Sequence, residues 1–212
     1  MTFAISSLIE SIVKGDIAGV KTACECALRE GFSPFVAIDE GMSKGLQIVG
    51  DKFQAGEFYL VDLISAAEAM KEGLKVLEPH LGGNATNKIG KIVLGTVAGD
   101  LHSIGKDLAC TLLRGVGFEV IDLGVDVPTE RFLEAVRLEK PAILGLSALI
   151  TSTMPEMGHV VQKLKDDGLR EHTKVIVGGA PVSSDFALSI EADSYAPNAP
   201  KGADICKQWV AK

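Results

Sequence analysis

The 212-residue sequence contains no apolar run of about eighteen residues, so it predicts no segment that spans a membrane. Its amino terminus lacks a basic stretch followed by an apolar core, which excludes the usual pattern of a secretory signal. None of its four cysteines belongs to a Cys-x-x-Cys pair. A free cysteine usually behaves as a small, buried apolar residue. These absences together predict a reduced, cytoplasmic protein.

Positive charge is also scarce. Lys and Arg number 21 against 28 Asp and Glu, so the net charge is −7. A protein that binds a phosphate backbone needs Lys and Arg clustered on one face, and the sequence contains no such cluster. Nucleic acid is therefore excluded as an expected partner.

The first part of the chain, residues 1–81, has only helical patterning. Apolar residues recur at spacings of three and four in four stretches, which predicts four short-connected helices in an antiparallel bundle. Asp16 and Ser33 are expected N-caps, the latter with Pro34 at the first helical position. The Gly- and Asn-rich segment 82–90 then predicts a linker that acts as a hinge.

Residues 90–212 alternate short apolar runs with amphipathic ones. The expected strands are Ile92–Val97, Glu119–Leu123, Ile143–Ser147, Val175–Val177 and Ser194–Ala196. The helices expected after them are Lys106–Gly115, Thr129–Leu138, Met154–Asp167, Ser184–Glu191 and Ala203–Ala211. Five successive strand–helix units predict an α/β domain with a doubly wound, five-stranded parallel sheet in the flavodoxin-like order 2-1-3-4-5.

Polar or small residues follow three of the expected strands. Asp100, His102 and Ser103 follow the first strand, the hydroxyl side chains of "GLSALITST" follow the third, and Gly178–Gly179 follows the fourth. The carboxyl ends of parallel strands meet at one edge, and the strand order reverses between the first and third strands. We therefore expect a ligand crevice at this edge.

Each loop also has a purely structural interpretation: a hydrogen-bonded histidine, hydroxyl caps of helices, and a glycine turn. Among ligands, a dinucleotide would need GxGxxG, a bare zinc ion three or four protein ligands, and a hydrolase GxSxG, and none of these patterns is present. A metal already held in its own organic ring needs only one protein ligand. A histidine backed by a carboxylate suits it, because the carboxylate orients the imidazole and raises its basicity.

Three short motifs carry a family resemblance. The segment "DLHSIG" resembles the DxHxxG motif of cobalamin-binding domains, and "SAL" at Ser147–Leu149 and "GG" at Gly178–Gly179 resemble the family's later motifs. The stretch "GLQIVGDKFQAGEFYLVDLISAAEAM" is similar to the helical cap of methyl-transferring members. The layout resembles the free-standing corrinoid proteins of methanol, methylamine and methyl-ether methyltransferase systems, and the B12-binding portion of methionine synthase.

This resemblance implies roles for individual residues. His102 is the implied lower ligand of cobalt in a base-off, His-on arrangement, Asp100 is its hydrogen-bond acceptor, and Thr153 completes a relay. Other implied cofactor-binding positions are Gly99, Leu101, Ser103, Ile104, Gly105, Ser147, Leu149, Thr151, Gly178 and Gly179, with the two glycines leaving room for the nucleotide tail. Phe53 and Leu60 are implied to cover the upper, methyl-bearing face, although both would serve equally as bundle core, and Asp39 falls where a relative has a glutamate.

The resemblance also implies a methyl carrier that cycles between cobalt(I) and methyl-cobalt(III). Its implied partners are a substrate:corrinoid methyltransferase, a second methyltransferase that passes the methyl group to tetrahydrofolate or a thiol, and a reductive activator. A chain of 212 residues has no room for an eight-fold barrel and carries no zinc-thiolate motif, so we expect a subunit that is not an enzyme alone.

Two other functions stay open at this point, a cobalamin-binding regulator or sensor and the small subunit of an adenosylcobalamin-dependent mutase. A flavodoxin-like protein with an unrelated ligand is the plainest alternative. A DNA-binding regulator would need a basic stripe that the sequence lacks, and a cap carrying Phe53 and Leu60 would crowd an adenosyl group.

Overall fold

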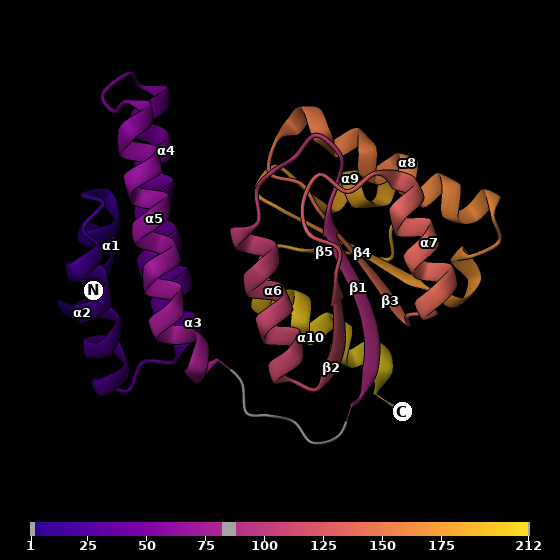
Figure 1. The fold of residues 1–212 in the computed structure, drawn as a ribbon, viewed down its shortest axis with the longest axis horizontal. Coiled ribbons are helices and arrows are strands. Elements are labelled where there is room, and N and C mark those ends of the chain that lie inside the picture. Colours follow the sequence, from indigo (N-terminus) through magenta and orange to yellow (C-terminus); the bar gives the residue numbers. More distant parts are fainter. Residues whose placement is uncertain (1–2, 82–87, 212) are drawn as a thin grey trace. The chain divides into compact units, whose positions relative to one another are not determined.

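A computed structural model of the chain describes residues 3–81 and 88–211. The chain divides into two compact units, Met1–Leu81 and Gly82–Lys212, each of which is considered by itself. Figure 1 shows the helical first unit and the α/β second unit. The predicted hinge at 82–90 falls mostly on residues 82–87, which lie outside the described part.

The first unit contains the four helical segments that the apolar spacing predicts. Its elements are α1 Phe3–Val13, α2 Ile17–Arg29, α3 Pro34–Val36, the π-helix η1 Ala37–Ser43, α4 Lys44–Gln54, α5 Leu60–Leu77 and the short 3₁₀ helix η2 Glu78–His80. Both predicted N-caps are confirmed. The Asp16 carboxylate accepts a hydrogen bond from the Gly19 N–H at 2.9 Å, and the Ser33 hydroxyl accepts one from the Val36 N–H at 3.3 Å.

The spacing predicts one α-helix for the third helical segment, but the π-helix η1 interrupts it. This π-helical stretch contains Gly41, and Gly45 follows in α4. A Cβ atom at Gly41 would lie 2.9 Å from Leu8, and one at Gly45 would lie 2.7 Å from Ile12. The two glycines therefore allow this segment to pack closely against α1, a tertiary contact that the apolar pattern does not report.

The second unit is a five-stranded parallel sheet in the order β2-β1-β3-β4-β5, which confirms the predicted topology. Its strands are β1 Gly90–Thr96, β2 Phe118–Asp122, β3 Ile143–Ser147, β4 Lys174–Gly178 and β5 Ser194–Ala196. Its helices are α6 Ile104–Gly115, α7 Thr129–Glu139, α8 Met154–Asp166, α9 Ser184–Ser189 and α10 Ala199–Val210, with 3₁₀ turns η3 Thr151–Thr153 and η4 Arg170–His172. The largest boundary difference is at α10, which begins four residues early because Asn198 caps it, accepting from the Lys201 N–H at 3.0 Å.

Helices cover both faces of this sheet (Figure 1). Helices α6 and α10 pack together on one face, and α7 and α8 pack together on the other. The core on the α7–α8 side joins Val93, Leu144 and Val175 of the three central strands to Phe132 and Met157 of the helices. Both faces of the central strands are thus buried, which is why these strands read as continuous apolar runs. Within the described ranges, no helix has the length and apolarity that a membrane crossing requires.

The packing of α7 onto the sheet yields a test of the fold. A Cβ atom at Gly95 of β1 would lie 2.7 Å from the Phe132 ring, whereas one at Gly105 of α6 would meet nothing within 4 Å. We expect Gly95→Ala to lower the free energy of unfolding by about 1–3 kcal/mol through overpacking. Gly105→Ala, at an unstrained helical position, should leave it unchanged or raise it by up to about 1 kcal/mol.

The fluorescence of Trp209, the single tryptophan, reports unfolding of this unit because the residue lies in α10. Urea titrations of the cofactor-free variants provide the measurement. Equal stability of the Gly95→Ala variant and the wild type would show that the contact between α7 and β1 is looser than these distances require.

Candidate functional site

The carboxyl ends of the central strands lie side by side, as the topology requires. Thr96 of β1 pairs with Ser147 of β3, and Ser147 pairs with Gly178 of β4. The loop after β1 carries Asp100 and His102, and the loop after β3 carries Leu149 and Ile150, ahead of η3. The strand order reverses beside this point, since β2 lies on the far side of β1, and both loops leave the same edge of the sheet.

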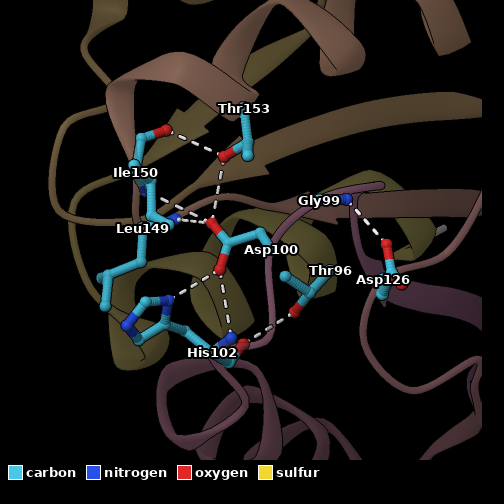
Figure 2. Close-up of polar contacts among 8 residues, drawn as sticks. All are labelled: Thr96, Gly99, Asp100, His102, Asp126, Leu149, Ile150 and Thr153. Carbon is cyan, nitrogen blue, oxygen red and sulfur yellow. Dashed lines mark hydrogen bonds and ion pairs between the residues drawn. The ribbon is translucent and has the colours of Figure 1, made fainter.

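Asp100 occupies the centre of the site and its side chain is fully buried. Its Oδ1 accepts from the His102 backbone N–H at 3.0 Å and lies 2.7 Å from His102 Nδ1. Its Oδ2 accepts from the backbone N–H groups of Leu149 at 2.7 Å and Ile150 at 3.2 Å, and it lies 3.1 Å from the Thr153 hydroxyl. Figure 2 shows these contacts converging on the one carboxylate.

This donor set governs the ionisation of Asp100. Burial alone would raise the pKa of the carboxyl group, but hydrogen bonds from Leu149, His102 and Thr153 outweigh it and hold the pKa at about 2. Asp100 is therefore a carboxylate at neutral pH and can only accept hydrogen bonds. Its neighbour His102 Nδ1 must then carry a proton and donate it.

The imidazole of His102 is exposed to solvent, so a metal could reach its free nitrogen. With Nδ1 protonated, the neutral imidazole has its lone pair on Nε2, the nitrogen that coordinates a metal in this orientation. The His102 side chain is 52% exposed, and Figure 2 shows Nε2 on the side of the ring away from Asp100. In the described residues, no group of three or more His, Cys, Asp or Glu side chains is arranged to hold a bare ion. The site offers one oriented imidazole.

The surroundings of His102 suit a flat, largely apolar group. Leu101 is 72% exposed, Leu149 45% and Ile150 39%, so apolar side chains flank the imidazole at the surface. Gly105 lies in the first turn of α6, has an ordinary helical φ, and faces open space. Neither backbone strain nor packing within the chain requires a glycine there.

The glycines after β4 have a different explanation from the one expected. A Cβ atom at Gly179 would lie 1.8 Å from the Ala148 carbonyl oxygen, and Gly179 has φ +131°. A Cβ atom at Gly178 would lie 3.2 Å from the Ala196 carbonyl oxygen. Close approach of neighbouring backbone requires Gly179 to be a glycine and leaves little space at Gly178, so their being glycine is not evidence of room for a nucleotide tail.

The other predicted positions lie on the same two loops. Ser103 precedes α6 but its hydroxyl does not cap the helix, and Ile104 is the first helical residue. Ser147 ends β3 and is partly buried. Thr151, in η3, is exposed. Thr153 is buried, and its hydroxyl lies 2.8 Å from the Ile150 carbonyl oxygen as well as 3.1 Å from Asp100 Oδ2. Both partners are acceptors, so they share its single proton.

In the first unit, Phe53 at the end of α4 is 41% exposed and Leu60 at the start of α5 is 63% exposed. Neither belongs to the bundle core, which excludes that alternative. Tyr59, Val61 and Ile64 beside them are more than 60% exposed as well. The end of α4 and the start of α5 thus expose a cluster of apolar side chains, whereas Asp39 lies in the first turn of η1.

Sequence reasoning missed three residues that hold the site. Ile150 donates its backbone N–H to Asp100, and the Thr96 hydroxyl donates to the His102 carbonyl oxygen at 3.0 Å. Asp126, in the loop after β2, accepts from the Gly99 N–H at 2.7 Å. The expected strand order contained the signal for Asp126, because β2 borders β1 and their following loops must be neighbours.

The lowered pKa of Asp100 makes a pH prediction for the cofactor-free protein. A carboxyl group whose pKa falls from 3.8 to about 2 on folding stabilises the fold above pH 4, and this contribution is lost as the pH falls towards 2. The loss corresponds to about 2 kcal/mol. We expect the free energy of unfolding of Asp100→Asn, which cannot titrate, to fall less steeply than that of the wild type by this amount. Trp209-monitored urea unfolding across this acid range measures the difference, and parallel profiles would contradict it.

Comparison with known proteins agrees with this geometry. Family models described as "B12 binding domain" match residues 90–200 and residues 4–78. "Trimethylamine corrinoid protein 1" of Methanosarcina acetivorans is 42% identical over 82% of this chain and 82% of that protein.

Two solved structures are also similar. The monomethylamine corrinoid protein of Methanosarcina barkeri is 35% identical, with a TM-score of 0.89 over 97% of each chain. A chain of the methanol:cobalamin methyltransferase complex of Methanosarcina barkeri is 30% identical, with a TM-score of 0.56 over 98% of this chain and 79% of that one. Both units of the sequence thus match, and this chain belongs to the family of B12-binding corrinoid proteins.

Proposed function

We propose that this protein is the corrinoid methyl carrier of a methylamine methyltransferase system, with His102 as the lower ligand of cobalt. The observation that carries the proposal is the His102–Asp100–Thr153 arrangement, in which a buried carboxylate accepts from Nδ1 at 2.7 Å and leaves Nε2 for a metal. The names of the similar proteins support the methylamine assignment, since they are corrinoid proteins for trimethylamine and monomethylamine.

When bound, cobalamin would supply a cobalt ion that can take up a methyl group and pass it on. The residues of the chain would hold and orient it. His102 would take the place of the cofactor's own benzimidazole in the proposed base-off, His-on arrangement, and Asp100 would keep the Nδ1 proton in place so that Nε2 remains the donor atom. Thr153 holds the Oδ2 side of Asp100, so the carboxylate cannot rotate away from the imidazole.

Other residues of the crevice edge would contact the rest of the cofactor. Leu101, next to His102 in the chain, and Leu149, in the loop after β3, would offer exposed apolar surface to a flat ring. Gly99 and Gly105 keep the backbone below it free of bulk, and Ile104, the first residue of α6, would add an apolar contact. The hydroxyls of Ser103, Ser147 and Thr151 are proposed contacts of the nucleotide tail, which would pass the end of β4 at Gly178–Gly179.

The helical unit is proposed as a cap for the upper face of the cofactor. Its exposed residues Phe53 and Leu60 supply the apolar surface that would exclude water and oxidants from a reactive metal. The cap must move aside when a partner reaches the methyl group, which gives the segment 82–90 its proposed role as a hinge.

The proposed partners supply the chemistry that the chain itself lacks. A substrate:corrinoid methyltransferase would deliver the methyl group, and a second methyltransferase would pass it to tetrahydrofolate or a thiol. A reductive activator would restore the cofactor after oxidation. One similar structure is a methyltransferase complex, which supports a partner of the first kind. The chain is thus proposed as a subunit of a transferase system and not as an enzyme alone.

Ligation by His102 makes a spectroscopic prediction. In the cob(II) state, replacing nitrogen-14 by nitrogen-15 in the histidines should change the nitrogen splitting of the electron paramagnetic resonance spectrum from a triplet to a doublet pattern. His102→Ala should lose this histidine coupling. His159→Ala should keep it, although His159 is also exposed and lies 3.3 Å from a carboxylate, that of Glu156. Coupling only to the benzimidazole of the cofactor in the wild type would refute the proposed ligand.

The cap makes a separate prediction. Replacing Phe53 and Leu60 together by alanine should speed the light-driven loss of methyl from bound methylcobalamin and leave retention of the cofactor unchanged, because the cap shields the methyl face only. The matched control replaces Phe3 and Leu138, which are 79% and 73% exposed elsewhere in the chain. Photolysis rates followed by absorbance decide the matter. Equal rates in both double variants and the wild type would show that Phe53 and Leu60 do not cover the cofactor.

A further inference from the structure

The loop after β2 runs beside the loop that carries the histidine. Backbone hydrogen bonds join the loop after β2 to the end of β1: Leu123 N–H to Leu94 carbonyl at 2.8 Å, Thr96 N–H to Gly124 carbonyl at 3.0 Å, and Val127 N–H to Thr96 carbonyl at 3.0 Å. The pairing thus continues past the end of β2, and a parallel bridge between Val97 and Val127 extends it one residue beyond β1. It brings Asp126 against the turn that precedes His102.

Asp126 makes two hydrogen bonds to that turn. Its carboxylate Oδ1 accepts from the Gly99 N–H at 2.7 Å, and its own backbone N–H donates to the Asp100 carbonyl oxygen at 2.9 Å. The two hydrogen bonds fix the Gly99 N–H and the Asp100 carbonyl oxygen. They therefore hold the backbone that sets the direction of the Asp100 side chain. Figure 2 shows Asp126 contacting this turn at Gly99, while Leu149, Ile150 and Thr153 contact the Asp100 carboxylate.

The backbone of Asp126 is unusual for a non-glycine residue, because it has φ +53°. Among the described residues, the other non-glycine residues with positive φ are Lys140 and Glu191, which follow the ends of α7 and α9 where a left-handed residue commonly terminates a helix. Asp126 follows no helix. Its left-handed conformation turns both the carboxylate and the N–H group towards the Gly99–Asp100 segment.

We propose that Asp126 is a positioning residue for the cobalt ligand, acting through the main chain of Gly99 and Asp100. The inference rests on the proposed role of His102. The clamp holds the Asp100 backbone so that its side chain reaches the N–H groups of the β3 loop and His102 Nδ1 at the same time. On the other side of the same turn, Thr96 holds the His102 carbonyl oxygen. The imidazole is thereby fixed by two neighbouring anchors from β1 and the β2 loop.

Asp126 itself is exposed, so removing its carboxylate leaves no buried charge without a partner. The substitution can therefore separate positioning from folding. Asp126→Gly adopts φ +53° without strain and lacks the acceptor. Asp126→Asn tolerates the same conformation and keeps an amide oxygen as acceptor, so it serves as the conservative rescue. Lys140→Gly is the matched control, because it relieves a left-handed residue far from the site in sequence and structure.

The test uses the cofactor-free, nitrogen-15-labelled protein, so it does not depend on whether His102 binds cobalt. Two signals report the clamp: the fraction of His102 protonated at Nδ1, and the hydrogen-exchange rate of the Leu149 N–H that donates to Asp100. In Asp126→Gly we expect a smaller Nδ1-protonated fraction and exchange at Leu149 faster by about tenfold relative to the wild type, the equivalent of one weakened charge-assisted bond. Exchange at Leu144, in the buried β3 strand, provides an internal reference for global stability.

Asp126→Asn and Lys140→Gly should both match the wild type in the two signals. The proposal is overturned if Asp126→Gly leaves both signals unchanged relative to Leu144, or if Lys140→Gly changes them equally. Either result would leave the proposal that His102 binds cobalt untouched. Conversely, absence of histidine nitrogen coupling in the cofactor-loaded wild type would refute His102 as the ligand, and the role of Asp126 could still be measured in the cofactor-free protein.

Discussion

The burial of a single carboxylate organises the site. Asp100 lies beneath the surface with no exposed area, and a charge in that position persists only if donors surround it. Five donor groups from His102, Leu149, Ile150 and Thr153 do so. Because Asp100 is ionised and can only accept, it also decides which nitrogen of His102 bears the proton. The protein thus sets the tautomer of its proposed metal ligand by satisfying a buried charge.

Those donors are remote from Asp100 in the chain and near it only in the fold. Leu149, Ile150 and Thr153 follow it by 49, 50 and 53 residues. The parallel sheet removes that separation, because β1 and β3 are neighbours and both loops leave the same edge. On the other flank of β1, β2 brings Asp126 to the same turn. Asp100, two residues before the proposed ligand His102, is therefore held by loops that follow both neighbouring strands.

Glycines in this structure meet two opposite requirements. Gly95 and Gly179 are small because other parts of the chain occupy the space of a side chain, the Phe132 ring in one case and the Ala148 carbonyl in the other. Gly105 has no such neighbour and no unusual φ. Its space opens to solvent, so under the proposed function a bound molecule could fill it. The same residue type therefore records internal packing at two positions and a proposed cofactor at the third.

Much of this protein follows from the sequence alone. Apolar spacing determines the four helical segments, the five strands and the parallel topology, because burial of each face requires residues at a fixed period. The "DLHSIG" segment likewise identifies Asp100 and His102, since two residues of separation at a strand end suffice for their contact. What the spacing could not reveal is long-range: the backbone donors of Leu149 and Ile150, the hydrogen bonds of Asp126 to Gly99 and Asp100, the π-helical stretch beside α1, and the exposure of Phe53 and Leu60. Each of these depends on which segments become neighbours and how closely their backbones approach, and only the tertiary structure decides that.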